Sequence, residues 1–283
     1  MIPYDSLVVF AMPWGKRSVK KLEEGKDWHT NEGVLRATDV HETEFGEVLQ
    51  TSLGVPVRVE RATLVDRLSG LKRKTQIIYP KDIAYICLKL GAGPGRKIIE
   101  AGCGSGGLTA ALSWYCGPTG EVISHDERDE FVRLARRNLE WAGLGENVRL
   151  YCRDIATGFA EKEGDALFLD VREPWLYLAQ ALEAVRPGAT LGFLVPTTSQ
   201  IDLLLKSMER EAFGEIEISE ILLREWKPVP DRLRPKDRMV AHTSFLIFCR
   251  KEIPDEKFAT YGSRGTRERK QDTAKAERLE ETN

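Results

Sequence analysis

The stretch Ile98-Ile-Glu-Ala-Gly-Cys-Gly-Ser-Gly-Gly-Leu-Thr109 decides the fold of this chain. An apolar run enters a turn rich in glycine and a second run leaves it, which predicts a strand, a tight turn and a helix. Glycine permits positive φ angles and lets a ligand approach the backbone closely. Because the first turn of a helix has free N–H groups, the segment predicts a cradle for a nucleotide-like ligand.

From residue 79 onward, strands and helices alternate on both sides of this turn. The expected strands are 96–100, 121–126, 148–154, 165–170 and 190–196. The expected helices are 83–90, 108–115, 128–141, 175–185 and 201–210. Two more strands, 216–226 and 243–249, follow with a long loop and no helix between them. This order predicts an α/β Rossmann-like sheet, mostly parallel, with an antiparallel hairpin at its edge.

Composition divides the chain into three parts. Residues 1–62 contain short alternating runs broken by glycine (6–12, 33–38, 46–52 and 55–60), which predict a small all-β domain. This domain shows no catalytic constellation, and we expect His29 and His41 to be surface or structural residues. Residues 63–252 form the α/β domain, and residues 253–283 form a charged tail that we expect to be flexible, because almost nothing in it is apolar.

The overall balance of charge excludes a protein that binds nucleic acid by bulk charge alone. The 283 residues include 42 Lys and Arg against 44 Asp and Glu, a formal net charge of −2. No apolar run approaches the ~20 residues of a membrane helix, and the start has no basic segment typical of a signal peptide. The 5 cysteines are scattered without a CxxC pair. We therefore expect a cytoplasmic protein with no metal site and no membrane contact.

The glycine pattern alone leaves two ligands open. Gly102, Gly104 and Gly107 fit the GxGxxG of dinucleotide binders, while Gly102, Gly104 and Gly106 fit a tighter GxGxG typical of S-adenosylmethionine binders. Three acidic residues at successive strand ends favour S-adenosylmethionine. Glu100 is awkward beside a pyrophosphate but suits an ammonium and a sulfonium. Asp126 is placed for ribose hydroxyls and Asp154 for an adenine amino group.

Asp170 ends the next apolar strand, and Pro174 and Trp175 follow it in a turn over the expected site. In class I methyltransferases this strand end is where the chemistry on the target atom occurs. Several of those enzymes have Asn or Asp followed directly by Pro-Pro and an aromatic residue. This chain departs from that pattern, because three residues separate Asp170 from Pro174.

Four segments together resemble tRNA (adenine-58-N1) methyltransferases of the TrmI type, with the archaeal branch as the nearest expected relative. The segments are Gln76-Ile-Ile-Tyr-Pro-Lys-Asp-Ile-Ala84, Glu100 to Thr109, Asp170 to Trp175, and Arg238-Met-Val-Ala-His-Thr243. The resemblance covers about residues 5–250 and includes Phe45 to Ser52. The glycine turn is typical of the whole superfamily, whereas Gln76–Asp82 and Asp170–Trp175 are more specific. Cys103 departs from the Thr or Ser that is frequent there.

The resemblance implies methyl transfer from S-adenosylmethionine to N1 of adenine 58 in the T-loop of tRNA. Some archaeal members also modify adenine 57. It further implies a homotetramer and Asp170 as the catalytic residue facing the target base. The cofactor-binding residues implied are Gln76, Ile78, Glu100, Gly102, Gly104, Ser105, Gly106, Gly107, Leu108, Thr109, Asp126, Asp154 and Asp170.

Adenine N1 lies on the base-pairing edge, so an enzyme must extract the base before it can reach this atom. Basic and aromatic residues around the pocket are therefore expected. Residues 67–81 are rich in Lys and Arg, and the loop 224–238 has 6 basic residues, 3 acidic residues and 3 prolines that favour an extended arm. The candidate tRNA contacts are Tyr79, Lys81, Arg232, Arg234, Arg238 and His242. Tyr79 and His242 fit a structural role equally well.

Three other readings stay open at this point. A methyltransferase of a small molecule, such as a precorrin-like acid, would keep the cofactor but would need neither the basic arm nor the β domain. A non-catalytic subunit that binds tRNA is disfavoured by the intact glycine turn and Asp170. A dinucleotide oxidoreductase is disfavoured by Glu100 and by the hairpin at the sheet edge.

Overall fold

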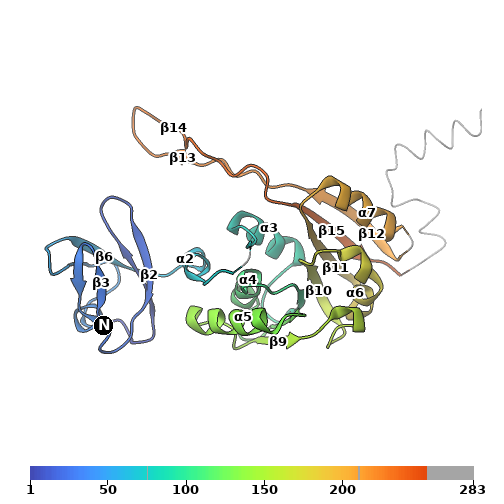
Figure 1. The fold of residues 1–283 in the computed structure, drawn as a ribbon, viewed down its shortest axis with the longest axis horizontal. Helices are drawn as coiled ribbons and strands as arrows, with labels where there is room; N and C mark the ends of the chain where they lie inside the picture. The colour runs from blue at the N-terminus through green and yellow to red at the C-terminus, as the bar shows by residue number, and fades with distance from the viewer. Residues whose placement is uncertain (75, 210, 254–283) are drawn as a thin grey trace, which may run out of the picture.

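The computed structural model describes residues 1–74, 76–209 and 211–253, and its largest feature is a seven-stranded sheet (Figure 1). The strand order is β12-β15-β11-β10-β7-β8-β9. The strands are β7 (Lys97–Ala101), β8 (Glu121–Asp126), β9 (Val148–Cys152), β10 (Gly164–Leu169), β11 (Val185–Val195), β12 (Phe213–Ser219) and β15 (Phe245–Lys251). Neighbouring strands from β11 to β9 are parallel, and β15 is antiparallel to β11 and β12. The predicted sheet and its terminal hairpin are confirmed.

Helices cover both faces of this sheet because side chains alternate along each strand. Ile98 and Phe168 pack on the face that carries α2 (Leu64–Gly70), α3 (Pro80–Leu90) and α4 (Gly107–Cys116). Ile99 and Leu167 pack on the opposite face, together with α6 (Leu178–Ala184) and α7 (Thr198–Met208). Helix α5 (Asp129–Ala142) lies on the first face and extends beside the glycine turn.

The N-terminal domain, residues 1–61, is built on a second, antiparallel sheet of order β2-β1-β6-β5. Its strands are β1 (Leu7–Ala11), β2 (Arg17–Lys21), β5 (Val48–Gln50) and β6 (Pro56–Arg61). A hairpin of β3 (Trp28–Thr30) and β4 (Gly33–Leu35) leads into α1 (Ala37–Glu42). The prediction of an all-β domain is therefore wrong at α1, where Ala37 and Val40 bury one helix face against the sheet. His41 has the structural role that was one of the two expected for it, because its ring stacks on Tyr4 and contacts the Ile2 carbonyl.

Some expected element boundaries are wrong. The segment expected as a helix over 175–185 begins as a 3-10 turn, η2 (Pro174–Tyr177), and α6 ends at Ala184. Strand β11 begins at Val185 because this residue pairs with Gly164 of β10. The strand expected over 216–226 ends at Ser219, where pairing with β15 stops. Helix α2 was not predicted, although Thr63 and Asp66 form a capping box at its start.

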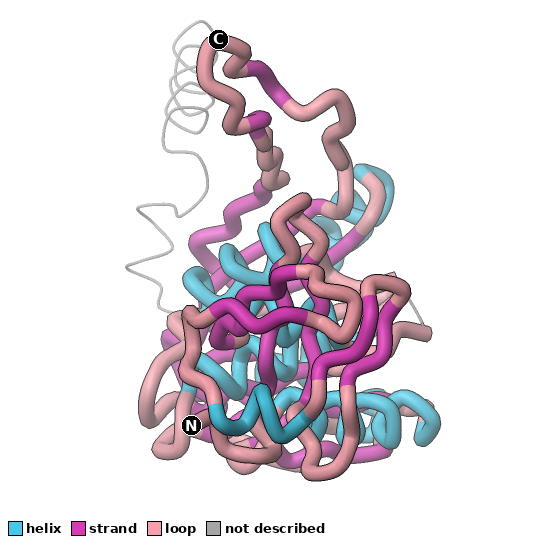
Figure 2. The backbone as a smooth tube through the Cα atoms, turned by 90° about the vertical axis from the view of Figure 1, so that its left-hand side faces the viewer, coloured by secondary structure: helices cyan, strands magenta, loops and turns pink. Residues whose placement is uncertain are grey.

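Residues 220–243 leave the sheet between β12 and β15 as a long extended arm. The arm contains a short ribbon of β13 (Trp226–Lys227) and β14 (Arg234–Pro235) near its tip. It projects on the same side of the sheet domain as the N-terminal domain, and it rises clear of both domains (Figures 1 and 2). The prediction of an extended arm without a helix is confirmed.

The expected boundary at residues 62 and 63 falls between β6 and α2, while all but the first residue of the tail at 253–283 lies outside the described residues. Within the described ranges, none of the helices combines the length and apolar character needed to span a bilayer. Nor does this part of the chain contain a group of three or more His, Cys, Asp or Glu side chains placed to hold a metal ion.

Candidate functional site

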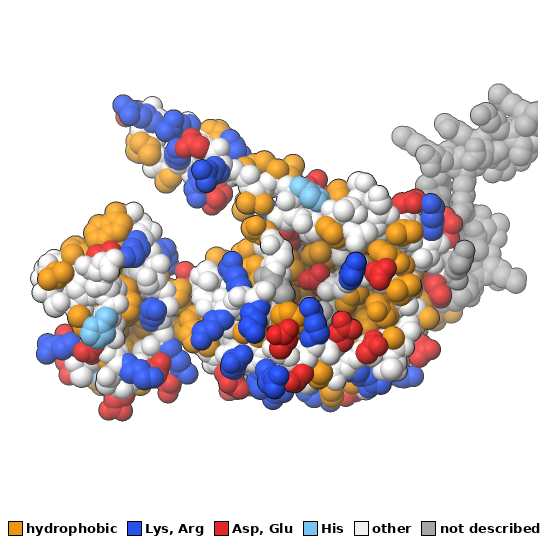
Figure 3. Space-filling view, in the orientation of Figure 1, with side chains coloured by type: hydrophobic (Ala, Val, Ile, Leu, Met, Phe, Trp, Pro, Cys, Tyr) orange, Lys and Arg blue, Asp and Glu red, His pale blue; other side chains and the backbone are white. Residues whose placement is uncertain are grey.

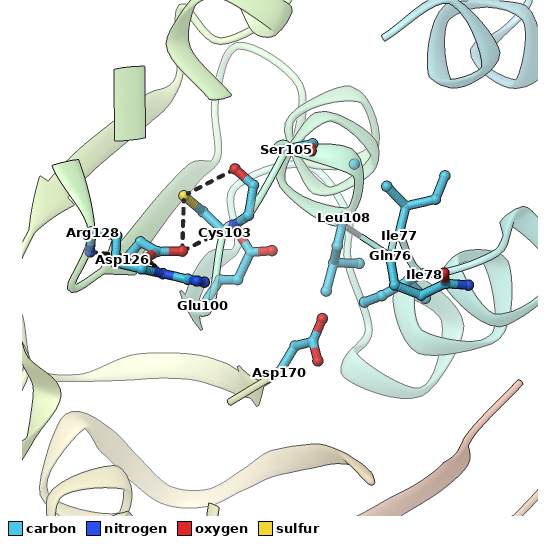
Figure 4. A pocket seen from close by; sticks show the side chains of 13 residues that line it. Gln76, Ile77, Ile78, Glu100, Cys103, Ser105, Leu108, Asp126, Arg128 and Asp170 are labelled. Carbon is cyan, nitrogen blue, oxygen red and sulfur yellow. Dashed lines mark hydrogen bonds and ion pairs between the residues drawn. The ribbon is translucent and has the colours of Figure 1, made fainter. Parts of the chain in front are cut away.

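A cavity of about 190 Å³ opens where β7, β8 and β10 end and α4 begins (Figure 4). It is lined by Gln76, Ile77, Ile78, Glu100, Gly102, Cys103, Gly104, Ser105, Gly107, Leu108, Asp126, Arg128 and Asp170. The loop between α2 and α3 supplies the first three residues, so it forms the wall opposite the strand ends. The structure thus brings together most of the residues that the sequence assigned to the cofactor.

Two glycines of the turn, Gly102 and Gly106, are required by geometry. Gly102 has φ of +89°, and a Cβ there would lie 2.0 Å from the backbone oxygen of Asp170. Gly106 is the N-cap of α4 with φ of +80° and packs against Ala135. A Cβ on Gly107, in contrast, would meet no atom within 4 Å, because this residue faces the open cavity. Gly102 and Gly106 therefore allow close packing of the backbone, whereas Gly107 leaves space for a ligand.

Glu100 lies at the floor of the cavity and is 1% exposed. The hydroxyls of Thr109 and Ser124 both donate to its Oε2 atom at 2.6 Å. Burial raises the pKa of Glu100 to about 7, despite these two hydrogen bonds. Thr109 is fully buried and does not line the cavity, so its side chain orients Glu100 instead of facing a ligand.

Asp126, at the end of β8, is held rigidly by backbone donors. Its Oδ2 atom accepts a hydrogen bond from the Gly104 amide at 3.1 Å, and its Oδ1 atom accepts one from the Arg128 amide at 3.0 Å. The turn and the strand end are therefore tied together through this carboxylate. Arg128 and Cys103 line the cavity beside it, and sequence reasoning missed both. Arg128 could have been anticipated from its position directly after the strand end.

Asp170 differs from the other acids because its carboxylate has no hydrogen bond or ion pair within the described ranges. The side chain is half-buried and points from the end of β10 toward the middle of the cavity (Figure 4). Burial, with a further contribution from Asp126, raises the pKa of Asp170 to about 6. An unpaired carboxylate in such a place is costly unless a ligand supplies the missing donor or positive charge.

A second hollow of about 420 Å³ continues the first one and shares Gly102, Asp126, Arg128 and Asp170 with it. Asp154 lines this second hollow, where it also caps the 3-10 turn η1 (Ile155–Thr157) by accepting from the Ala156 amide at 2.8 Å. Asp126 and Asp154 thus face one elongated space, as their positions at adjacent strand ends predict.

The candidate tRNA residues do not all gather in one place. Arg232, Arg234 and Arg238 are exposed on the arm. Tyr79 is the half-buried N-cap residue of α3 and lines neither hollow, although it directly follows Ile78. The expectation that Lys81 faces tRNA is not met. Its side chain is only 7% exposed and forms an ion pair with the buried Asp82.

His242 lies at the base of the arm. Its Nδ1 atom is 2.6 Å from the Glu220 carboxylate and its Nε2 atom is 2.9 Å from the Pro196 carbonyl oxygen. Both partners accept hydrogen bonds, and they raise the pKa of His242, with Glu220 as the larger cause. The structure therefore gives His242 a role in fastening the arm, which was one of the two roles expected for it.

The charges on the arm are divided unevenly. Lys227 pairs with Asp237, and Lys236 pairs with Glu225 at 3.0 Å. These two pairs use two of the three acidic residues between 224 and 238. The arginines of the same segment make no ion pair with any described residue, so their guanidinium groups are available to a partner (Figure 3).

Comparison with known proteins places these features in one family. Residues 68–233 match the family described as tRNA methyltransferase complex GCD14 subunit. A tRNA (adenine(57)-N(1)/adenine(58)-N(1))-methyltransferase TrmI from Methanocaldococcus jannaschii is 30% identical over 269 residues, covering 86% of this chain and 93% of that protein.

Two solved structures share the whole architecture. A SAM-dependent O-methyltransferase from Thermotoga maritima superposes with a TM-score of 0.84 and is 39% identical, covering 90% of this chain and 96% of that one. The tRNA (m1A58) methyltransferase TrmI from Aquifex aeolicus has a TM-score of 0.77 and 37% identity, covering 89% of this chain and 99% of that one. These matches do not favour the archaeal branch over the bacterial one.

Proposed function

This chain belongs to the family described as tRNA methyltransferase complex GCD14 subunit, and we propose that it transfers a methyl group from S-adenosylmethionine to N1 of adenine 58 in the T-loop of tRNA. The observation that carries the proposal is the unpartnered Asp170 carboxylate, directed into a cavity that the glycine turn also lines. A relative that acts on both positions supports adenine 57 as a second target.

The residues present fit S-adenosylmethionine. Glu100, Asp126 and Asp170 surround the cavity with carboxylates, which suits a cofactor that bears a sulfonium and an ammonium. The open space over Gly107 leaves room for a ligand close to the backbone of α4. We assign Asp126 and Asp154 to the ribose and adenine end, and Gln76 and Ile78 to the opposite wall. When bound, the cofactor supplies an electrophilic methyl group.

The chemistry asks little of the protein beyond positioning. Adenine N1 already carries a lone pair, so no side chain has to generate the nucleophile. Holding the base in line with the methyl group can contribute up to ~7–11 kcal/mol to the rate. Asp170 accepts a hydrogen bond from the exocyclic amino group and stabilises the positive charge that the adenine acquires on methylation. With its pKa raised to about 6, Asp170 is mostly ionised at neutral pH and can do so.

The arm supports an RNA substrate. Its unpaired arginines offer charge-assisted hydrogen bonds to phosphates. The arm also exposes large apolar side chains, among them Trp226 and Leu233 at 53% and 69% exposure. Because such side chains are rarely left in water as a group, we assign them to contacts with further copies of this chain in a homotetramer. We further propose a cytoplasmic location, which is supported by the tRNA substrate and by cysteines that are free in the structure.

One observation favours a second candidate. The structurally similar Thermotoga maritima protein is described as an O-methyltransferase. An oxygen acceptor would need a general base to remove its proton, and Asp170 would be that base. The remaining small-molecule alternative rests on neighbours such as a precorrin-8w decarboxylase at 16% identity, and these show the fold alone.

One experiment separates these candidates. Unmodified tRNA is incubated with the protein and S-adenosylmethionine carrying a labelled methyl group, and the nucleosides are analysed by mass spectrometry. The proposal predicts labelled 1-methyladenosine and no labelled 2′-O-methylnucleoside. A label on ribose oxygen would favour the second candidate. No label in tRNA, with cofactor binding shown by calorimetry, would reject tRNA as the substrate of the chain alone.

A further inference from the structure

Two segments that the sequence analysis singled out meet in space, although about 160 residues separate them. Lys81 and Asp82 belong to the segment 76–84, and His242 and Thr243 belong to the segment 238–243. The Lys81 Nζ atom donates to Asp82 Oδ1 at 2.8 Å and to Thr243 Oγ1 at 2.6 Å. The Thr243 hydroxyl in turn donates to Asp82 Oδ2 at 2.8 Å. We call this closed ring of three side chains the Lys81–Asp82–Thr243 cluster.

The cluster is centred on a buried carboxylate, and its hydrogen bonds are complete. Asp82 is 1% exposed, and both of its carboxylate oxygens have a donor. Asp82 also lies in the first turn of α3, where a negative charge is stabilised by the free N–H groups of the helix. A buried ion pair contributes little net stability compared with apolar packing, but it fixes the relative positions of the elements that carry it. Here those elements are α3 and the returning end of the arm.

His242 provides a second attachment beside the first one. It joins the Pro196 carbonyl, directly after β11, to Glu220 at the departing end of the arm. Strand β11 lies next to β10, whose end carries Asp170. Both ends of the arm are therefore fixed to the edge of the sheet on which the candidate site lies.

The cluster also borders the loop that forms one wall of the cavity. The Asn138 side chain accepts from the Lys72 amide at 3.0 Å and donates to the Lys72 carbonyl at 2.8 Å, which fixes the start of this loop against α5. Its last residues, Gln76 to Ile78, line the cavity, and Tyr79 caps α3 immediately before Lys81 and Asp82. The loop is thus held at its start by Asn138 and at its end by the cluster.

From this arrangement we infer that the Lys81–Asp82–Thr243 cluster is a positioning element that aligns the arm, and the RNA held by it, with the cofactor wall formed by Gln76–Ile78. The inference rests on the proposed function, because it assigns to the cluster the alignment of that substrate. The three side chains touch no ligand themselves. They act by keeping α3 and the base of the arm in a single relative position during methyl transfer.

Replacing Thr243 tests this role with almost no change of shape. Thr243→Val removes the hydroxyl that links Lys81 to Asp82, whereas Thr243→Ser keeps it. Thr190→Val serves as a control, because Thr190 is a buried threonine of β11 without a side-chain hydrogen bond. We expect Thr243→Val to lower kcat for tRNA at least 10-fold at saturating cofactor. The Kd for S-adenosylmethionine should stay within 2-fold, and Thr243→Ser should restore kcat.

A readout without substrate keeps the inference separate from the proposed function. In Thr243→Val, backbone amide hydrogens of residues 76–83 and 239–244 should exchange faster than in the wild-type protein. The exchange rates in β7 and β8 should stay the same. If the cluster had only a structural role, Thr243→Val would lower the melting temperature but leave kcat unchanged at temperatures where the protein is folded. That result would overturn the inference. Unchanged exchange at 76–83 would overturn it as well. If the unchanged protein does not methylate tRNA, the proposed function fails, and the exchange data alone decide whether the cluster couples the two segments.

Discussion

The carboxylate of Asp170 is the group on which the proposed chemistry depends. It lies at the end of β10, faces the cavity and has no partner within the described part of the chain. Glu100 and Asp126, in contrast, are each held by at least two donors and so serve as fixed walls. Asp170 is therefore free to bind a substrate, whereas Glu100 and Asp126 shape the cavity around it.

Asp170→Asn should therefore separate catalysis from binding. The amide keeps the size of the side chain but loses the negative charge, so we expect kcat to fall about 10²- to 10⁴-fold. The affinity for S-adenosylmethionine should fall by much less than kcat, because the Glu100 and Asp126 carboxylates remain in the cavity. Steady-state kinetics and calorimetry measure the two quantities, with Asp129→Asn on the exposed start of α5 as control. Equal losses in kcat and cofactor affinity would make Asp170 a binding residue only.

The raised pKa values of Glu100 and Asp170 predict that cofactor affinity depends on pH. Burial holds these pKa values at about 7 and about 6, so both groups carry protons at mildly acidic pH. A cationic cofactor favours the ionised forms, and binding must release protons. We expect affinity to rise with pH up to about 7 and then to level off. Calorimetry in buffers of different ionisation enthalpy would show the proton release, and Glu100→Gln should flatten the rise.

The same shifts predict how the protein without cofactor responds to pH. A carboxyl group whose pKa is raised by folding contributes stability at low pH, and this contribution is lost as pH rises through the folded value. We expect the loss to fall between about pH 4 and pH 7. The increase in melting temperature caused by S-adenosylmethionine should grow over the same interval. An increase that is independent of pH would contradict the assignment of these carboxylates to the cofactor.

At the scale of elements, the turn between β7 and α4 links fold and site. A Cβ at Gly102 would overlap the Asp170 backbone in a left-handed conformation, so Gly102→Ala should cost about 2 kcal/mol or more of unfolding free energy. A Cβ at Gly107 meets no atom, so Gly107→Ala should keep stability within about 0.5 kcal/mol and yet weaken cofactor binding. Denaturant titration and calorimetry test the pair. Full cofactor affinity in Gly107→Ala would contradict the placement of the ligand beside α4.

Sequence patterns predicted the helices and strands that are determined by neighbouring residues in the chain. The alternation of strands and helices from β7 to α5 follows from apolar periodicity and glycine punctuation, and the strand ends placed Glu100, Asp126 and Asp170 at one edge. Elements that depend on distant partners were missed. Strand β2 is partly exposed and owes its place to pairing with β1. The burial of Lys81 depends on Thr243, which no local pattern around residue 81 reveals.

The arginines of the arm should contribute to tRNA binding. Replacing Arg232, Arg234 and Arg238 together by Gln should raise the KM for tRNA about 10-fold or more and leave cofactor affinity unchanged. The slope of log affinity against log salt should become shallower by up to about 2, since each lost phosphate contact to a flexible strand contributes about 0.7. A control triple at Arg36, Lys162 and Lys206, which are paired elsewhere on the surface, removes equal charge. If both triple variants changed the KM for tRNA equally, the arm would contribute only its general positive charge to tRNA binding.

At the scale of the whole molecule, the sheet and one loop form the site, and the arm leaves the sheet from the same edge. The sheet supplies the carboxylates, and the loop after α2, which follows the N-terminal domain, supplies the opposite wall. The arm projects on the same side as the N-terminal domain (Figure 1) and is fixed at its base by His242 and Thr243. A small-molecule enzyme has no use for such an exposed, arginine-bearing extension, whereas a folded RNA spans the distance between separate parts of a protein.

Methyl transfer to N1 of adenine 58 is best tested by position-resolved mass spectrometry. An unmodified tRNA transcript and a variant with guanosine at position 58 are treated with the protein and labelled S-adenosylmethionine, then digested into mapped oligonucleotides. We expect one labelled methyl group on the base at position 58 of the first transcript, with or without a second at position 57. In the variant the label at position 58 should be absent. Label elsewhere in the tRNA, label on ribose, or no label in either transcript would show that the protein is not an adenine-58 N1-methyltransferase.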